Sequence, residues 1–98
     1  IEFYKLVGTY RAYFETEDGT VRVEIEVLKT HHGEYTYRTS HAIHTPLQAG
    51  PYHSSRTTAQ TPEAALEKAI DDITSYFDGA VREGHVSSVD WFSENASF

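Results

Sequence analysis

Cysteine is absent from this chain of 98 residues. Its absence excludes disulfide bonds, thiolate metal sites and cysteine nucleophiles, and it is consistent with a cytoplasmic protein. No run approaches the roughly 20 apolar residues that a membrane-spanning helix requires. A chain of this length can bury one modest core. We therefore expect a single domain over residues 1–98, stabilised by the packing of seven tyrosines, five phenylalanines and one tryptophan.

Basic residues are also scarce. The chain has eight lysines and arginines against 15 aspartates and glutamates, which gives a net charge of −7 with neutral histidines. Such a chain repels phosphate backbones, so direct binding to nucleic acid is disfavoured. The acidity favours a partner protein with a basic surface, or else it only aids solubility.

The motifs of several enzyme classes are missing. There is no nucleophile elbow, no phosphate-binding loop and no glycine-rich dinucleotide fingerprint. We therefore expect a binding protein rather than an enzyme, with no cofactor and no catalytic residues.

The pair Asp18-Gly19 predicts a two-residue hairpin, because a type I′ turn needs positive φ at both central positions. This turn pairs Glu17 with Thr20. On one face it creates the apolar pairs Phe14–Val23, Ala12–Ile25 and Tyr10–Val27. The apolar stretch 1–7 extends the first strand, with a bulge at Gly8.

A second turn is predicted at His31-His32-Gly33, with the glycine in the left-handed region. It pairs Thr30 with Glu34 and completes a three-stranded meander over about residues 2–43. The resulting apolar-face pairs are Val27–Tyr37, Ile25–Thr39, Val23–His41 and Val21–Ile43. On the other face a charged rung joins Arg11, Glu26 and Arg38.

The connection over residues 44–60 has no helical period and is interrupted by Pro46 and Gly50-Pro51. Two alternatives remain open for it. Residues 52–59 form a short further strand, because long structureless loops are uncommon in compact domains. Otherwise the connection is a functional loop.

One helix is predicted over about residues 62–83. Thr61 suits the N-cap, Pro62 the first helical position and Gly84 the C-terminal end. Its apolar positions recur every three or four residues, at Leu66, Ala69, Ile70, Ile73, Phe77, Ala80 and Val81.

Alternation after the helix predicts a last strand over residues 86–92, in which Trp91 is a packing residue. The expected fold class is α+β, an antiparallel sheet of three to five strands with one long helix packed on one face.

The helix start resembles a known family. The segment Thr61-Pro62-Glu63-Ala64-Ala65-Leu66-Glu67-Lys68-Ala69-Ile70, which follows strands, is similar to the helix of HicB-like antitoxin domains. That family has a β-β-β-α-β layout, but its usual Pro-Asp-Leu-Pro-Gly segment is missing here, so no functional residue is transferred. In size and charge the chain is also similar to small phage-encoded inhibitors, including anti-CRISPR proteins.

These observations favour a non-enzymatic protein-binding module of inhibitor or antitoxin type. Its basic partner would meet five acidic residues, Glu24, Glu26, Asp71, Asp72 and Asp78. One alternative is a small-ligand or metal-binding domain that uses the connection, through His44, Tyr52, His53 and Arg56. The spacing of the six histidines does not require a metal, so no metal site is predicted. A third reading is a homodimer that pairs two copies through an edge strand.

Overall fold

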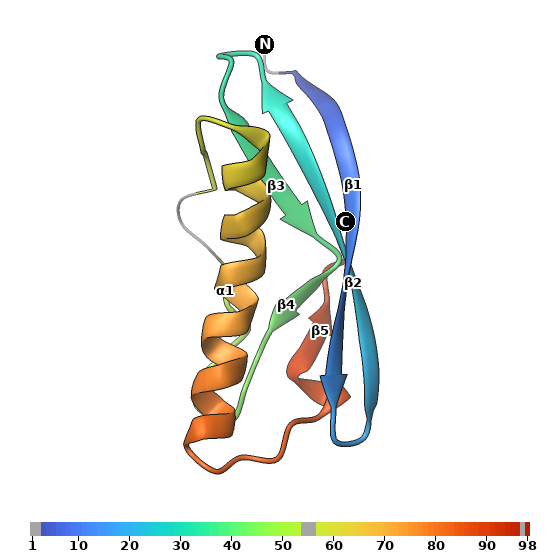
Figure 1. Cartoon of the computed structure of the whole chain (residues 1–98), viewed down its shortest axis with the longest axis vertical. Helices are drawn as coiled ribbons and strands as arrows, with labels where there is room; N and C mark the ends of the chain where they lie inside the picture. The colour runs from blue at the N-terminus through green and yellow to red at the C-terminus, as the bar shows by residue number, and fades with distance from the viewer. Residues whose placement is uncertain (1–2, 54–56, 97) are drawn as a thin grey trace.

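The computed structural model describes residues 3–53, 57–96 and 98, and it contains two antiparallel sheets and one long helix (Figure 1). The first sheet has the order β1-β2-β3, and the second pairs β4 with β5. The expected α+β class is confirmed. In chain order the elements are β1 (Tyr4–Thr16), β2 (Gly19–Thr30), β3 (Tyr35–Thr39), β4 (His41–Ile43), α1 (Pro62–Arg82), the 3₁₀ helix η1 (Val89–Trp91) and β5 (Phe92–Glu94).

The β2–β3 hairpin has the predicted turn. Gly33 has φ of +85°, and the Thr30 N–H donates to the Glu34 carbonyl at 2.7 Å. This three-residue loop sets the register along both strands. The predicted pairs Ile25–Thr39, Glu26–Arg38 and Val27–Tyr37 are all confirmed.

The β1–β2 hairpin turns one residue earlier than predicted. Thr16 pairs with Gly19, so Glu17 and Asp18 form the turn, and both keep negative φ. The Asp18 carboxylate is held by the Ser88 hydroxyl and the Val89 N–H, both at 2.8 Å. These bonds to a segment distant in sequence favour the turn at Glu17 and Asp18 over the predicted turn at Asp18-Gly19.

Between Gly8 and Thr16 the corrected register shifts every β1–β2 pair by two residues. The apolar-face pairs are Phe14–Val21, Ala12–Val23 and Tyr10–Ile25, and the predicted partners of these three β1 residues are wrong. An even shift leaves each side chain on its predicted face, since side chains alternate with period two. The bulge predicted near Gly8 is confirmed, because the register shifts between Leu6 and Gly8.

The meander ends at Thr39 rather than near residue 43. Ser40 still donates its N–H to the Glu24 carbonyl at 2.9 Å, but its hydroxyl accepts from the Glu24 N–H at 2.9 Å. A side chain thus replaces the next backbone bond, and the chain leaves β2. The predicted pairs Val23–His41 and Val21–Ile43 are wrong.

The short strand β4 instead pairs with β5 near the end of the chain. Ile43 lies opposite Phe92, and His41 lies opposite Glu94. The last strand therefore covers residues 92–94, not the predicted 86–92, because residues 89–91 form η1. The Ser88 hydroxyl caps η1 by accepting from the Asp90 N–H at 3.1 Å.

The described parts of the connection, residues 44–53 and 57–60, contain no β-strand. Of the strand expected over residues 52–59, only a bridge between Ala59 and Tyr35 is present, while residues 54–56 lie outside the described part. The Gln48 side chain holds the first turn of the connection. It accepts from the Thr45 N–H at 2.8 Å and donates to the Ile43 carbonyl at 3.1 Å.

Helix α1 begins and ends close to the predicted residues. The Thr61 hydroxyl accepts from the Ala64 N–H at 3.1 Å, and Gly84 follows the C-cap with φ of +93°. Val81, expected on the apolar stripe, is 46% exposed, so that assignment is wrong. The buried helix positions are Ala65, Ala69, Ile73 and Ala80.

The core lies between α1 and the two sheets. Val23, Ile25 and Ile43 are almost completely buried there, together with Trp91 and Phe92 from the end of the chain. The predicted packing role of Trp91 is confirmed, since its ring meets Phe77 edge-on at 5.4 Å.

Candidate functional site

The two outer edges of the three-stranded sheet, at β3 and at β1, differ in how far other parts of the chain cover them. The β3 edge is bonded to the connection: Tyr35 and Ala59 exchange two backbone hydrogen bonds, at 2.9 and 2.7 Å, and the Thr36 hydroxyl donates to Thr57 Oγ1. Helix α1 also lies on this side of the sheet, whereas β1 lies on the side away from the helix (Figure 1). We refer to the side of β1 that faces away from β2 as the free edge.

The pattern of β2–β3 bonds shows which backbone groups lie on the free edge. The backbone N–H and C=O of Glu24 face β3, because both bond to Ser40. Arg11 lies opposite Glu24. Opposed residues in an antiparallel pair either bond to each other or both point outward, so the N–H and C=O of Arg11 point away from the sheet. The same alternation applies to Thr9, Tyr13 and Glu15.

No backbone hydrogen bond joins these four outward residues to any other described residue. Native proteins usually shorten, cover or charge such an edge, because it is a template for pairing. Here the strand is 13 residues long. The strand carries a bulge and Lys5 before Gly8, and the regular stretch that follows carries two charged residues, Arg11 and Glu15.

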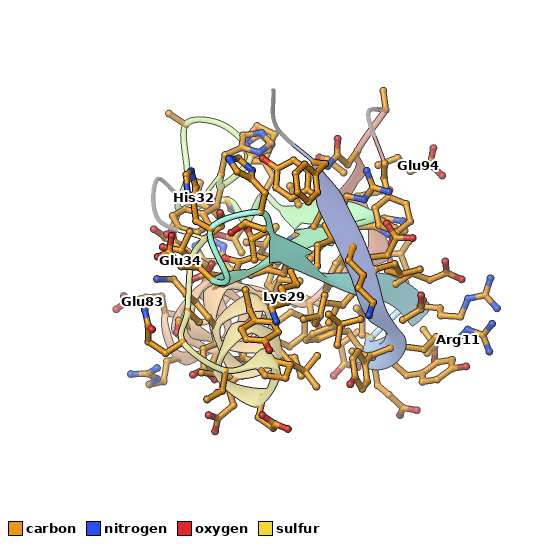
Figure 2. All side chains as sticks on the ribbon, turned by 90° about the horizontal axis from the view of Figure 1, so that it is seen from above. Arg11, Lys29, His32, Glu34, Glu83 and Glu94 are labelled. Atoms are coloured by element: carbon orange, nitrogen blue, oxygen red, sulfur yellow. The ribbon has the colours of Figure 1, made fainter. Side chains whose placement is uncertain are left out.

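The free edge also carries the largest concentration of exposed apolar side chains among the described residues. Tyr13 is 62% exposed, and Arg11 beside it extends away from the ribbon into solvent (Figure 2). Side chains alternate between the two faces of a strand, so these residues flank the edge on both faces of the sheet. The exposed apolar residues on β1 or directly before it are Phe3, Tyr4, Leu6, Val7, Tyr10 and Tyr13.

The two acidic residues predicted on the sheet are neutralised by arginines. Glu26 is ion-paired with Arg38, and Glu24 lies 3.7 Å from both Arg11 and Arg22. The expected rung of Arg11, Glu26 and Arg38 is therefore wrong at Arg11, as the shifted register requires. The sequence alone does not predict that these glutamates are neutralised, because the ion pairs depend on which arginine lies opposite which glutamate.

The three acidic residues predicted on the helix separate into two groups. Asp71 and Asp78 are exposed. Asp72 is half-buried and accepts a hydrogen bond from the Tyr37 hydroxyl, which ties α1 to β3. The structure adds two exposed residues at helical spacing, Glu63 and Glu67, and we name Glu63, Glu67, Asp71 and Asp78 the acidic stripe.

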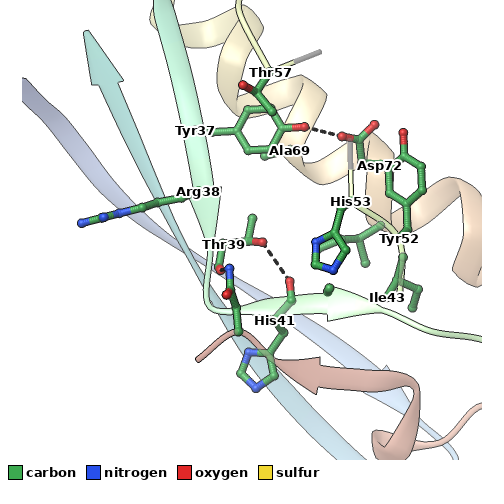
Figure 3. Close-up of a pocket in the computed structure, with 13 residues that line it drawn as sticks. Tyr37, Arg38, Thr39, His41, Ile43, Tyr52, His53, Thr57, Ala69 and Asp72 are labelled. Atoms are coloured by element: carbon green, nitrogen blue, oxygen red, sulfur yellow. Dashed lines mark hydrogen bonds between the residues drawn. The ribbon is translucent and has the colours of Figure 1, made fainter. Parts of the chain in front are cut away.

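A small cavity of about 180 Å³ lies between α1, β3, β4 and the connection (Figure 3). Tyr52 and His53, two of the predicted ligand-binding residues, line it. His44 does not line it, and its backbone N–H donates to the Trp91 carbonyl at 2.7 Å. Arg56 lies outside the described residues.

Four polar residues that the sequence did not single out also line this cavity, namely Tyr37, Thr39, Thr57 and Asn95. They come from three separate parts of the chain, and no sequence spacing links them. The Asn95 amide donates to the Thr39 carbonyl at 3.2 Å, which joins two of the lining residues. Among the residues that the structure describes, no three histidine, aspartate or glutamate side chains are close enough to hold a metal ion.

A second, more open cavity of about 440 Å³ lies at the end of the sheet near the β2–β3 turn. Lys5 and Lys29 lie directly opposite each other there. The His31 ring stands between Phe3 and His32, with ring centroids at 5.3 and 4.0 Å. The ammonium groups of Lys5 and Lys29 make this end of the sheet locally cationic on a chain of net negative charge.

Comparison with known protein families, curated proteins and solved structures found no match to this chain. Within the described ranges, no helix is long and apolar enough to cross a membrane.

Proposed function

We propose that this protein is a protein-binding module that engages its partner by strand addition at the free edge of β1. The observation that carries the proposal is a 13-residue edge strand without cover among the described residues, flanked by exposed aromatic and aliphatic side chains. Strand addition is a common mode of recognition, in which backbone bonds give affinity and alternate side chains give specificity.

The outward orientation of Arg11 and Tyr13 on β1 supports this proposal. Arg11 and Tyr13 point both their backbone groups and their exposed side chains away from the core, so a partner strand can reach them without disturbing β2. Tyrosine and arginine are enriched at the centres of protein interfaces. The helix lies on the other side of the sheet and leaves this edge accessible (Figure 1).

The experiment that tests this function uses phage-displayed peptides selected against the folded protein. Arg11→Pro is the key variant, because it removes an outward N–H that β2 does not use and proline is tolerated at such edge positions. Arg11→Gln keeps the N–H and is the matched control. We expect selected peptides to bind wild type and to shift the amide resonances of β1. Binding should be weaker in Arg11→Gln, which loses the guanidinium group, and should be lost in Arg11→Pro, which also loses the N–H. Peptides that bind all three proteins equally would contradict the proposal.

A second candidate function is suggested by the acidic stripe on α1. No described ion pair neutralises its four carboxylates, so they present uncompensated negative charge to solvent. A basic partner protein is the class that this surface would attract, in keeping with an inhibitor or antitoxin type of module. The resemblance of the helix start to HicB-like antitoxin domains supports the same reading.

The stripe is tested by charge reversal at Asp71 and Asp78. The probe is a basic protein such as lysozyme or a histone, titrated at two salt concentrations. We expect the double variant Asp71→Lys, Asp78→Lys to bind more weakly and with a smaller salt dependence. Equal affinity for the variant and wild type would exclude the stripe as the contact surface.

A further inference from the structure

We infer that the strand added to the free edge is β1 of a second copy of this chain, so that two copies form one continuous six-stranded antiparallel sheet. The inference rests on the proposed function and names its partner. A two-fold dimer requires a surface that complements itself. The free edge meets this requirement in its backbone geometry and in its side-chain order.

The backbone geometry selects the paired stretch. Between Gly8 and Thr16 the strand is regular, whereas the bulge before Gly8 interrupts the ladder. An antiparallel pairing of this stretch with its own copy is centred on Ala12. Ala12 bonds to β2 on its inner side, so the two Ala12 residues would form a non-hydrogen-bonded pair, with Cα atoms about 4.5 Å apart.

The side chains around this centre complement each other. On the outer face, Arg11 of each copy meets Tyr13 of the other, a pairing in which the guanidinium can stack on the ring. On the inner face, Tyr10 meets Phe14, and aromatic cross-strand pairs are among the favourable ones. Thr9 meets Glu15 at both ends, and no like charges lie opposite each other.

A register centred one residue earlier is disfavoured by charge. It would place Arg11 directly opposite Arg11, and like charges in that position are destabilising. A register centred one residue later would place Tyr13 opposite Tyr13 and Arg11 opposite Glu15. It uses a shorter part of the strand, because Thr9 would then face Glu17, whose N–H already donates to the Ser87 hydroxyl and carbonyl.

Two exposed aromatic side chains of each copy lie within the paired stretch. Tyr10 is 42% exposed and Tyr13 is 62% exposed, and the pairing places both against the second copy. Tyr4, Leu6 and Val7 are also exposed, but they lie before the bulge and outside this stretch.

The first measurement is the mass in solution by analytical ultracentrifugation across a concentration series. We expect wild type to approach twice the 11.1 kDa of one chain. Arg11→Gln loses the guanidinium stacking but keeps the N–H, so we expect it to dimerise more weakly than wild type. Arg11→Pro should weaken the dimer at least about tenfold beyond Arg11→Gln, because one backbone bond is lost on each side of the axis. Circular dichroism and thermal melts confirm that all three proteins are folded.

The second measurement tests the register through a covalent bond. The chain has no cysteine, so Ala12→Cys introduces one thiol on the expected two-fold axis, where the Cα separation suits a disulfide. We expect mild oxidation to convert Ala12→Cys to a covalent dimer much faster than Ser75→Cys, an exposed helix control. Tyr13→Cys tests the alternative centre.

The outcomes separate this inference from the proposed function. If wild type is monomeric at every concentration yet binds extended peptides through β1, the inference of a second copy is overturned and the proposed strand addition still holds. A dimer that Arg11→Pro does not weaken also overturns the inference, because another surface then forms it. A monomer that binds no peptide through β1 overturns both. Faster oxidation of Tyr13→Cys than of Ala12→Cys overturns the Ala12 register.

Discussion

Asp18 and Val89 are joined across 71 positions of sequence by a hydrogen bond of 2.8 Å, in which the Val89 N–H donates to Asp18 Oδ1. The second carboxylate oxygen accepts from the Ser88 hydroxyl at 2.8 Å. One side chain therefore holds the tip of the first hairpin against η1. These bonds stabilise the charged form and lower the pKa of Asp18, with the Val89 N–H as the largest cause, followed by Ser88 and Thr16.

The first prediction concerns the pH dependence of this contact. A carboxyl whose pKa is lower in the folded state stabilises the protein above its unfolded pKa of about 3.9, and this stabilisation is lost as pH falls through the folded value. We expect Asp18→Asn to be less stable than wild type by a constant amount above about pH 5. The difference should shrink below about pH 4. Urea denaturation at a series of pH values measures it.

Asp78→Asn is the control for this measurement, because Asp78 is exposed on the helix and makes no hydrogen bond or ion pair with a described residue. If the difference in unfolding free energy between wild type and Asp18→Asn stays unchanged down to pH 2, the carboxylate charge has no part in the contact.

The second prediction tests the β1–β2 register with double-mutant cycles. Exposed ion pairs contribute about 0.2–1 kcal/mol, so we expect a small positive coupling for Glu26–Arg38 and for Arg11–Glu24. Coupling for Arg11–Glu26 should be near zero, since these residues are not opposite each other. A coupling for Arg11–Glu26 larger than that for Arg11–Glu24 would restore the register expected from the Asp-Gly turn.

The third prediction concerns the core beneath the helix. Ile25 is fully buried on β2. Ile25→Val should cost about 0.5–1.5 kcal/mol and Ile25→Ala about 2–5 kcal/mol of unfolding free energy, because the second change leaves a larger cavity. Val86→Ala, at a site that is 71% exposed, should change stability by less than about 0.5 kcal/mol. Chemical denaturation of the three variants would contradict this order if Val86→Ala cost as much as Ile25→Ala.

The fourth prediction concerns the start of α1. Removing the Thr61 hydroxyl leaves the Ala64 N–H without its cap, so Thr61→Ala should cost about 1 kcal/mol. Thr61→Ser keeps the acceptor and should stay within a few tenths of a kcal/mol of wild type. Thermal melts of the two variants compare them directly, and equal losses would show that the methyl group rather than the hydroxyl matters.

The parts of the fold that sequence reasoning predicted depend on local signals. Helix α1 follows from Thr61 and Pro62, whose chemistry needs no distant partner. The β2–β3 register follows from Gly33, because a left-handed residue defines the loop length. The alternation of Val23, Ile25 and Val27 likewise predicts which face is buried.

The parts that failed depend on partners far away in sequence. The first turn moved because Asp18 bonds to Ser88 and Val89, and nothing near Asp18 reveals this. The third strand ended early because the Ser40 side chain replaces a backbone bond, after which β4 finds β5. The free edge could have been inferred from the apolar residues before Gly8, but only the strand order shows that no described strand covers it.

The pairing of β4 with β5 has a consequence for how the protein is made. During synthesis the β1–β2–β3 meander leaves the ribosome before Trp91 and Phe92, which contribute to the core. Until they emerge, Ile43 lacks its partner Phe92, and Phe77 lacks its contacts with Trp91 and Phe92. The edge of β1 is therefore exposed while the core is still incomplete, a stage at which unpaired strand edges make chains prone to associate.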